Sequence, residues 1–206
     1  MAEQDRPQIY LITPPAFDPE PFGDRLAAVL DAVPVACLRL ALASRDEAEL
    51  GRAADELREI AHSRDIPLVV EAHIGLAERH GLDGVHLTDA ARSVRAARKA
   101  LGTEAIIGAY CGASRHDGLN AGEAGADYVS FGPVGASALG RGEQAEAELF
   151  AWWSEMIEVP VVAEGALSRE LVEALAGATD FFAVGEEIWG AEDAVVALRA
   201  LLAPIL

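Results

Sequence analysis

An arginine lies inside an almost wholly apolar stretch of this 206-residue chain, where a charged side chain is costly to bury. Residues 35–40 read VACLRL, and strand alternation would place Arg39 on the same side as Cys37 and Ala41. A buried guanidinium is tolerated when it meets an anion. Arg39 is therefore either a cation that binds an anionic ligand or the ion-pair partner of a nearby carboxylate, and the sequence leaves both open.

Two carboxylates and two imidazoles lie in or just after the next two apolar stretches: Glu71, His73, His86 and Asp89. These groups suit a divalent cation such as Mg²⁺ or the transfer of protons. Their spacing matches no metal motif, and His86, inside the apolar GVHL, is expected to be a buried histidine with a hydrogen-bond partner, or else a ligand contact. We expect Glu71 and Asp89 to be the catalytic and metal-binding carboxylates.

Three polar residues lie at the end of the apolar stretch 105–110 or shortly after it. Tyr110 is expected to contact the ligand through its ring. Ser114 is expected to cap the following helix. His116 is a candidate general base, although a histidine in the first turn of a surface helix is the commoner arrangement.

Glycines next to acids end the last two apolar stretches: Glu164 precedes Gly165, and Gly185 precedes Glu186. Backbone N–H groups beside such glycines receive phosphate in many barrels. A carboxylate within ~5 Å would repel a phosphate by roughly several kcal/mol at reduced dielectric. We expect these four residues to line a ligand site, with the two acids opposing a phosphate there.

Each of these residues follows a short apolar run, and the runs alternate with amphipathic segments. The runs are IYLIT, VACLRL, PLVVEA, GVHL, AIIGAY, DYVSFG, PVVAE and FFAV. The amphipathic segments cover about residues 20–33, 46–64, 74–80, 91–101, 117–125, 146–158, 168–177 and 190–203. Eight such units predict one parallel (β/α)8 TIM barrel over residues 1–206, with the candidate residues at the strand ends. The alternative is a doubly wound open sheet, in which a glycine-rich turn that binds a dinucleotide would follow the first apolar run. The segment TPPAFDP stands there instead. We therefore favour the barrel and expect no organic cofactor.

The charge balance excludes one class of partner, because 34 acidic against 16 basic residues give a net charge of −18. Nucleic-acid binding needs clustered lysine and arginine, and we expect none. No apolar run reaches the ~18 residues that span a bilayer, and the first residues lack a signal pattern. We therefore expect a cytoplasmic protein that does not bind membranes.

The segment EAELFAWWSEMIE at 146–158 is richer in aromatic residues than one buried helix face requires. Its inward stripe is expected to be Leu149, Trp153, Met156 and Ile157. Phe150 and Trp152 then lie off that face. They either pack on a neighbouring helix or mark the interface of a homo-oligomer, with Trp152 as its anchor.

The order YLIT, LR, PLVV, DGVHL, IIG, GADYVSFGPV, PVVAEGAL and FFAVGEEIW resembles the thiamine-phosphate synthase family and its relative, the thiazole tautomerase. The resemblance covers nearly the whole chain. It implies a barrel that joins a pyrimidine diphosphate to a thiazole phosphate, with Mg²⁺ on the leaving pyrophosphate, in a homo-oligomer. The pyrimidine would meet the second to fifth strands, and the thiazole phosphate the seventh and eighth.

Carried over by resemblance, Arg39 matches the pyrophosphate-binding arginine of the family. The glutamine and lysine that flank this arginine are replaced by Cys37 and Ala41, and an Asn-Asp pair by Glu71 and Ala72. The Gly-Gln after GVHL becomes Thr88 and Asp89, the metal-binding aspartate falls near Ala91, and a serine becomes Tyr110. A loop lysine falls at Gly140, with Arg141 beside it as a substitute cation. In the thiazole-phosphate region, Glu164 replaces an apolar residue and Glu186 a serine.

The resemblance thus implies a thiamine-metabolism enzyme that acts on a small heteroaromatic substrate. Arg39 would bind its anionic part, and Glu71, Asp89 or His116 would move protons. Because several cations and the Asn-Asp pair are replaced, we expect little ordinary synthase activity.

The alternative is a barrel without catalysis that binds a neutral or cationic heteroaromatic compound. Tyr110 would stack on that ligand, and Glu164 with Glu186 would pair with its positive charge.

Overall fold

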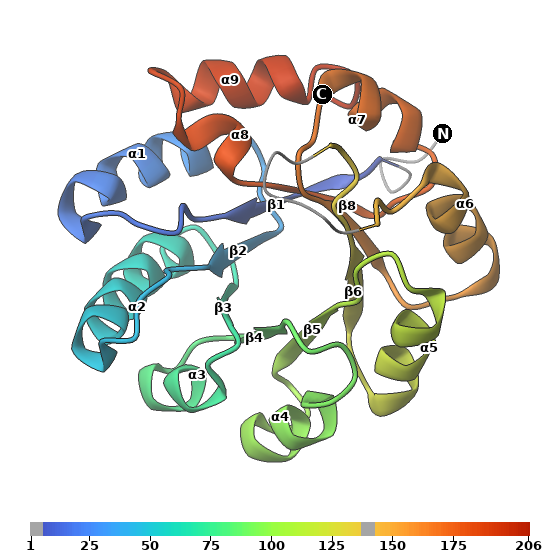
Figure 1. Ribbon diagram of the computed structural model, residues 1–206. Coiled ribbons are helices and arrows are strands. Elements are labelled where there is room, and N and C mark those ends of the chain that lie inside the picture. Colours follow the sequence, from blue (N-terminus) through green and yellow to red (C-terminus); the bar gives the residue numbers. More distant parts are fainter. Residues whose placement is uncertain (1–5, 137–142) are drawn as a thin grey trace.

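A closed barrel of eight parallel strands forms the centre of the computed structural model, which describes residues 6–136 and 143–206 (Figure 1). The strands are β1 (Gln8–Ile12), β2 (Cys37–Leu40), β3 (Leu68–Glu71), β4 (Gly84–Leu87), β5 (Ile106–Tyr110), β6 (Tyr128–Phe131), β7 (Val161–Glu164) and β8 (Phe181–Val184). Each strand pairs with the next, and β8 closes the barrel on β1 with Gln8 opposite Phe181. The TIM-barrel prediction is confirmed, with every apolar run in its expected place.

Helices surround the barrel (Figure 1). They are α1 (Pro19–Ala32), α2 (Glu47–His62), α3 (Ile74–His80), α4 (Val94–Leu101), α5 (Arg115–Ala124), α6 (Ala147–Met156), α7 (Arg169–Leu175), α8 (Glu186–Trp189) and α9 (Ala194–Leu201). The segment expected as one helix over 190–203 differs: a separate short helix, α8, begins directly after β8. None of the helices in the described ranges is long and apolar enough to span a bilayer.

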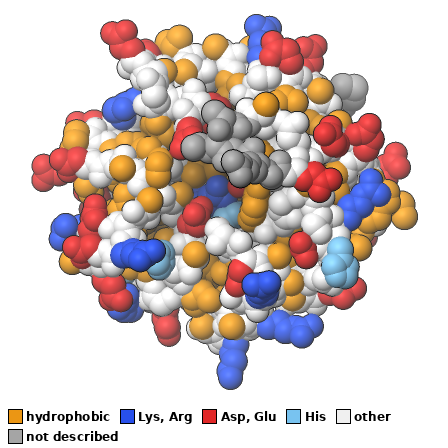
Figure 2. All heavy atoms as spheres, in the orientation of Figure 1, with side chains coloured by type: hydrophobic (Ala, Val, Ile, Leu, Met, Phe, Trp, Pro, Cys, Tyr) orange, Lys and Arg blue, Asp and Glu red, His pale blue; other side chains and the backbone are white. Residues whose placement is uncertain are grey.

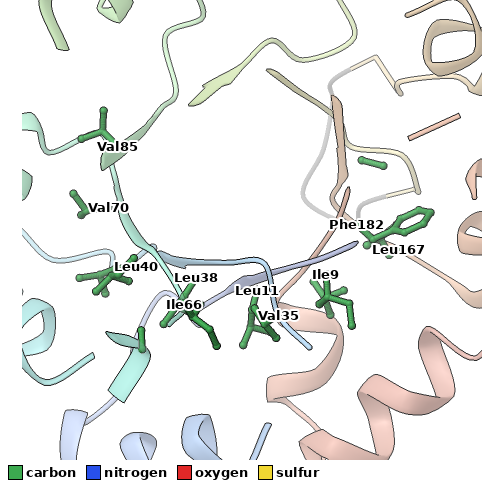
Figure 3. Packing of buried hydrophobic residues seen from close by; sticks show 14 of the residues in the cluster. Ile9, Leu11, Val35, Leu38, Leu40, Ile66, Val70, Val85, Leu167 and Phe182 are labelled. Carbon is green, nitrogen blue, oxygen red and sulfur yellow. The ribbon is translucent and has the colours of Figure 1, made fainter. Parts of the chain in front are cut away.

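Two apolar layers hold the barrel together. The larger layer lies between strands and helices, and Figure 3 shows part of it, including Leu11, Leu38 and Val70. The smaller layer fills the barrel interior and consists of Tyr10, Cys37, Val69, Tyr128, Val162 and Ala183. Because both faces of each strand are covered, the strand sequences are almost continuously apolar, which is why they could be located from sequence.

Aspartates at the starts of strands tie neighbouring strands together. Asp83, directly before β4, accepts a hydrogen bond from the backbone N–H of Leu68 at 2.7 Å. Asp180, before β8, accepts one from Val161 at 2.8 Å. Asp127, before β6, accepts one from the N–H of Ile107 in the same way. The carboxylate thus satisfies a donor at the start of the preceding strand, and it fixes how the two strands meet.

Helix α6 corrects the expected inward stripe. Phe150 is fully buried and packs edge-on against Phe131, whereas Met156 is 63 % exposed. Trp153 is buried as expected, and its indole N–H donates to the carbonyl of Val159. Met156 is the last residue of the helix, and it does not belong to the buried face. Trp152 is half-buried, and the guanidinium of Arg115 lies 4.8 Å from the centre of a ring of its indole.

Candidate functional site

A cavity of about 290 Å³ opens at the C-terminal ends of the strands, where barrel enzymes carry their sites. Figure 2 shows basic, acidic and histidine side chains gathered in a central hollow of the molecule. The charged residues that line the cavity are Arg39, Glu71, Glu164, Glu186 and Glu187. Gly165 and Gly185 line it as well. The structure therefore brings six of the residues expected from sequence into one place, together with Glu187.

Arg39 points into the barrel mouth from β2 and is only 5 % exposed. Its Nη1 donates to Glu164 Oε2 at 3.1 Å, and its Nε lies 3.7 Å from Glu71 Oε2. Burial is the largest single effect and by itself lowers the pKa of this guanidinium, but Glu164, Tyr10, Tyr128 and Glu71 together outweigh burial, and the net shift is upward. Arg39 is thus the ion-pair partner of two carboxylates here, and a ligand anion would have to compete with them.

A buried polar chain lies below Arg39 inside the barrel. The hydroxyls of Tyr10 and Tyr128 are 2.7 Å apart, and Tyr128 also contacts Nδ1 of His86 at 2.9 Å. The Arg39 guanidinium carbon lies 5.6 Å from the centre of the Tyr10 ring. The ring of Tyr128 fits because position 108 is glycine: a Cβ there would lie 2.0 Å from Tyr128 Cζ.

The three hydrogen-bonded side chains inside the barrel, Tyr10, Tyr128 and His86, stay uncharged. Burial, reinforced by the charge of Arg39, lowers the pKa of His86 well below its usual value. Burial also raises the pKa of both tyrosines. His86 is therefore a neutral, hydrogen-bonded core histidine, as its place in GVHL indicated, and it does not line the cavity in front of Arg39.

A second cavity, of about 590 Å³, lies beside the first between the ends of β4 and β5. Asp89 and Tyr110 line it. Asp89 Oδ2 accepts a hydrogen bond from Ser93 at 2.6 Å, while its buried Oδ1 has no partner among residues 6–136 and 143–206. The two carboxylates expected to act together, Glu71 and Asp89, thus line separate cavities.

Tyr110 lines the second cavity. Its hydroxyl donates to the carbonyl of Gly132 at 2.6 Å, which fixes the ring. Burial and the nearby charge of Glu164 raise its pKa. Tyr110 therefore faces Glu164 from the second cavity, and its half-exposed ring can contact a flat ligand.

Of the remaining candidates, His116 lines neither cavity, Ser114 lines the second, and Arg141 falls outside the described residues. His116 is exposed on α5, and its Nε2 accepts a hydrogen bond from Asn120 at 3.0 Å. Ser114 caps α5 as expected, through the N–H of Asp117. Arg141 and Gly140 fall in residues 137–142, outside the described part of the chain.

The described residues contain no group of three or more His, Cys, Asp or Glu side chains that could hold a metal ion. The donor set that a magnesium ion would find is therefore small. Asp89 suits a magnesium ion in one respect, because its Oδ1 is a carboxylate oxygen without a partner among the described residues. Mg²⁺ often uses one or two carboxylates and completes its shell with water and substrate phosphates.

Sequence reasoning missed the roles of Tyr10, Tyr128 and Glu187. Both tyrosines occupy inward positions of buried strands, and a polar hydroxyl at such a position signals a buried partner. Glu187 is the second of two consecutive acids after β8. Its Oε1 accepts from the N–H of Leu167 at 3.0 Å, and its Oε2 from that of Gly185 at 2.9 Å. The sequence offered no means of separating it from its neighbour Glu186.

Known proteins share this architecture. The family model described as thiamine monophosphate synthase matches residues 9–188. The thiamine-phosphate synthase of Rhodospirillum centenum is 42% identical over 88% of this chain and 89% of its own, and that of Erythrobacter litoralis is 41% identical over 94% and 93%. The solved structure of a thiamine phosphate pyrophosphorylase from Pyrococcus furiosus superimposes with a TM-score of 0.82 at 24% identity, over 97% of this chain and 96% of that one. This chain belongs to the thiamine monophosphate synthase family.

Proposed function

We propose that this chain acts in thiamine biosynthesis as a synthase-type protein that binds a small heteroaromatic compound at the barrel mouth. We also propose that it joins pyrimidine diphosphate and thiazole phosphate slowly. The family match and the names of its relatives support the first part. A single observation supports the second: Arg39, a cation that lines the first cavity, is already bound by Glu164.

The transfer of a diphosphate depends on cations that are in place before the reaction. Among the described residues that line the two cavities at the strand ends, the cations are Arg39 and Arg92. Arg39 shares its charge with Glu164 and Glu71. A leaving diphosphate with about three negative charges would therefore meet more carboxylates than cations, and its departure would gain little from the site.

Asp89 is the residue that we propose to hold Mg²⁺, on the strength of its unpartnered Oδ1. An ion bound there would offset part of the charge of a leaving diphosphate. Glu71 lines the other cavity, beside Arg39, and we propose it as the group that moves a proton. His116 has less support for that role, because it is exposed on α5 and lines neither cavity.

A second candidate function has an observation of its own. Among the described residues, Glu71, Glu164, Glu186 and Glu187 line the first cavity together with one arginine, Arg39. Such an excess of carboxylates favours a cation or a neutral ring over an anion. The protein would then bind a thiamine-related compound without catalysing its formation, with Tyr110 against the ring.

The slow-synthase proposal is tested by turnover with saturating pyrimidine diphosphate, thiazole phosphate and Mg²⁺. We expect product to form well below about 1 per second, the low end for ordinary enzymes. Glu164→Gln keeps the side-chain length but frees the charge of Arg39, and it should tighten the binding of inorganic pyrophosphate. Glu173→Gln removes the same charge from the exposed face of α7 and should leave binding unchanged. Wild-type turnover in the usual range of enzymes would contradict the proposal.

Calorimetry separates the two candidate functions. Thiamine, its phosphates and the two precursor halves are titrated into the wild-type protein. Binding of both phosphorylated precursors supports a synthase. Binding of thiamine or of the unphosphorylated halves, with no affinity for the phosphorylated ones, supports the binding protein. Binding of none of these compounds would remove thiamine metabolism as the function.

A further inference from the structure

Glu187 is a carboxylate built into the loops that follow β7 and β8. Its two oxygens accept hydrogen bonds from the N–H groups of Leu167 and Gly185, at 3.0 and 2.9 Å. Leu167 belongs to the loop after β7, and Gly185 directly follows β8. One side chain thus bridges the two loops with charge-assisted hydrogen bonds, and it lines the first cavity while doing so.

Backbone N–H groups of these two loops are the ones that hold phosphate in many barrels of this architecture. Here two of them already have an anionic partner. An incoming phosphate would have to displace Glu187 and would also face Glu164 and Glu186 in the same cavity. We propose that Glu187 is a specificity-determining residue that occupies this pair of donors and competes with phosphate, so that this end of the cavity binds a phosphorylated ligand weakly and favours an unphosphorylated one.

The two donors are held in place by contacts that do not involve Glu187. The loop before Leu167 has positive φ at Gly165 and Ala166, and the N–H of Gly135 donates to the carbonyl of Gly165 at 3.1 Å. A Cβ at position 135 would lie 2.0 Å from the carbonyl oxygen of Ala166, so the two segments are in close contact.

The second donor, the N–H of Gly185 after β8, is also held in place by contacts that do not involve the Glu187 carboxylate. The carbonyl of Gly185 accepts from the N–H of Ile188, and the indole of Trp189 donates to the carbonyl of Ile12 at 2.6 Å. Removal of the Glu187 carboxylate should therefore leave both N–H groups facing the cavity.

The test uses inorganic phosphate as the probe and isothermal calorimetry as the readout. Glu187→Ala should bind phosphate at least about tenfold more tightly than the wild type, because two donors to a charged group become free. In ¹⁵N-resolved spectra the amide signals of Leu167 and Gly185 should move with phosphate in Glu187→Ala and stay in place in the wild type.

Two further variants separate occupancy of the donors from loss of charge. Glu186→Gln removes one negative charge from the exposed neighbour. Glu187→Gln removes the same charge and one of the two acceptors. Phosphate should bind more tightly to Glu187→Gln than to Glu186→Gln. This comparison decides the matter even where Glu187→Ala fails to fold.

Equal phosphate affinity in Glu187→Gln and Glu186→Gln, or in Glu187→Ala and the wild type, would overturn the inference. It rests on the proposed function only for the thiamine-related identity of the ligand. A protein that binds no thiamine compound but gains phosphate affinity in Glu187→Ala would contradict the function and keep the role of Glu187. Synthase turnover by the wild type, with no gain of phosphate affinity in Glu187→Ala, would support the proposed function and overturn the role of Glu187.

Discussion

At the scale of single residues, the site is defined by carboxylates that have taken partners within the protein. Glu164 holds Arg39, and Glu187 holds two backbone N–H groups. A charged hydrogen bond of this kind contributes about 1.5–3 kcal/mol, so a ligand must offer more than that to replace it. We therefore expect a low affinity for anions, because the competing anions belong to the chain itself.

The neutral state of His86 predicts a pH dependence of stability. Burial keeps its pKa in the folded protein well below the usual value, whereas in the unfolded chain it titrates near about 6.5. Below that pH the unfolded state binds one proton more. The free energy of unfolding should therefore fall with decreasing pH, by up to about 1.4 kcal/mol per pH unit from this group.

His86→Gln keeps a hydrogen-bond acceptor for Tyr128 and cannot titrate. Urea denaturation between pH 7 and 5 should show a shallower loss of stability in this variant than in the wild type. The other titratable groups contribute equally to both proteins, so the difference isolates His86. Parallel pH profiles for the two proteins would show that folding does not lower the pKa of His86.

Sequence reasoning predicted a hydrogen-bonded core position for His86 and, as one of two alternatives, an ion-pair partner for Arg39, because a charged or titratable residue inside an apolar run has few ways to be satisfied. It did not give the contact between Tyr10 and Tyr128, which are 118 positions apart. That contact depends on barrel register, with Tyr10 opposite Cys37 and Ala183. The separation of Glu71 from Asp89 depends on the same register and on how each loop leaves its strand.

At the scale of elements, the strands were predictable and the helix ends less so. Strands buried on both faces have apolar runs that end abruptly, which fixes their positions within about a residue or two. The inward face of helix α6 was mispredicted in two ways: Ile157 lies beyond the helix end at Met156, and Phe150, expected off that face, is buried. Helix α8 was missed because four residues carry no periodicity.

The aspartates at strand starts predict a measurable contribution to stability. Asp180→Ala removes the acceptor for the N–H of Val161 and leaves that donor unsatisfied. Thermal or urea denaturation should show a loss of about 1–3 kcal/mol in the free energy of unfolding. Asp180→Asn, which keeps one acceptor oxygen, should lose less.

The matched control for this prediction is Glu192→Ala, which removes an exposed acid in the turn before α9. It should change stability by less than about 0.5 kcal/mol. A loss in Asp180→Ala no larger than in Glu192→Ala would mean that the strand-start hydrogen bond contributes nothing.

At the scale of the whole molecule, we propose a homo-oligomer through the outer helices, with Trp152 as an anchor. Trp152 is half-buried beneath Arg115, and the neighbouring Met156 is 63 % exposed on the same helix. The contact has to be apolar, because a net charge of −18 on each chain opposes association.

Light scattering should give a mass above the 21.7 kDa of one chain, and Trp152→Ala should lower it. Val196→Ala, which trims an exposed apolar residue on α9, is the control and should not change the mass. A monomer at high concentration, or unchanged assembly of Trp152→Ala, would contradict the proposal.

The pairing of β8 with β1 joins strands from opposite ends of the chain, whereas every other strand pair is formed by consecutive strands. A polypeptide that stops before Phe181 would lack this last partner. It would carry two open sheet edges, on β1 and β7, with unpaired N–H and C=O groups and apolar side chains on both faces. Such edges are templates for pairing between chains. A fragment of this kind should therefore aggregate, and the eighth strand protects the protein against pairing between sheet edges of different chains as much as it completes the site.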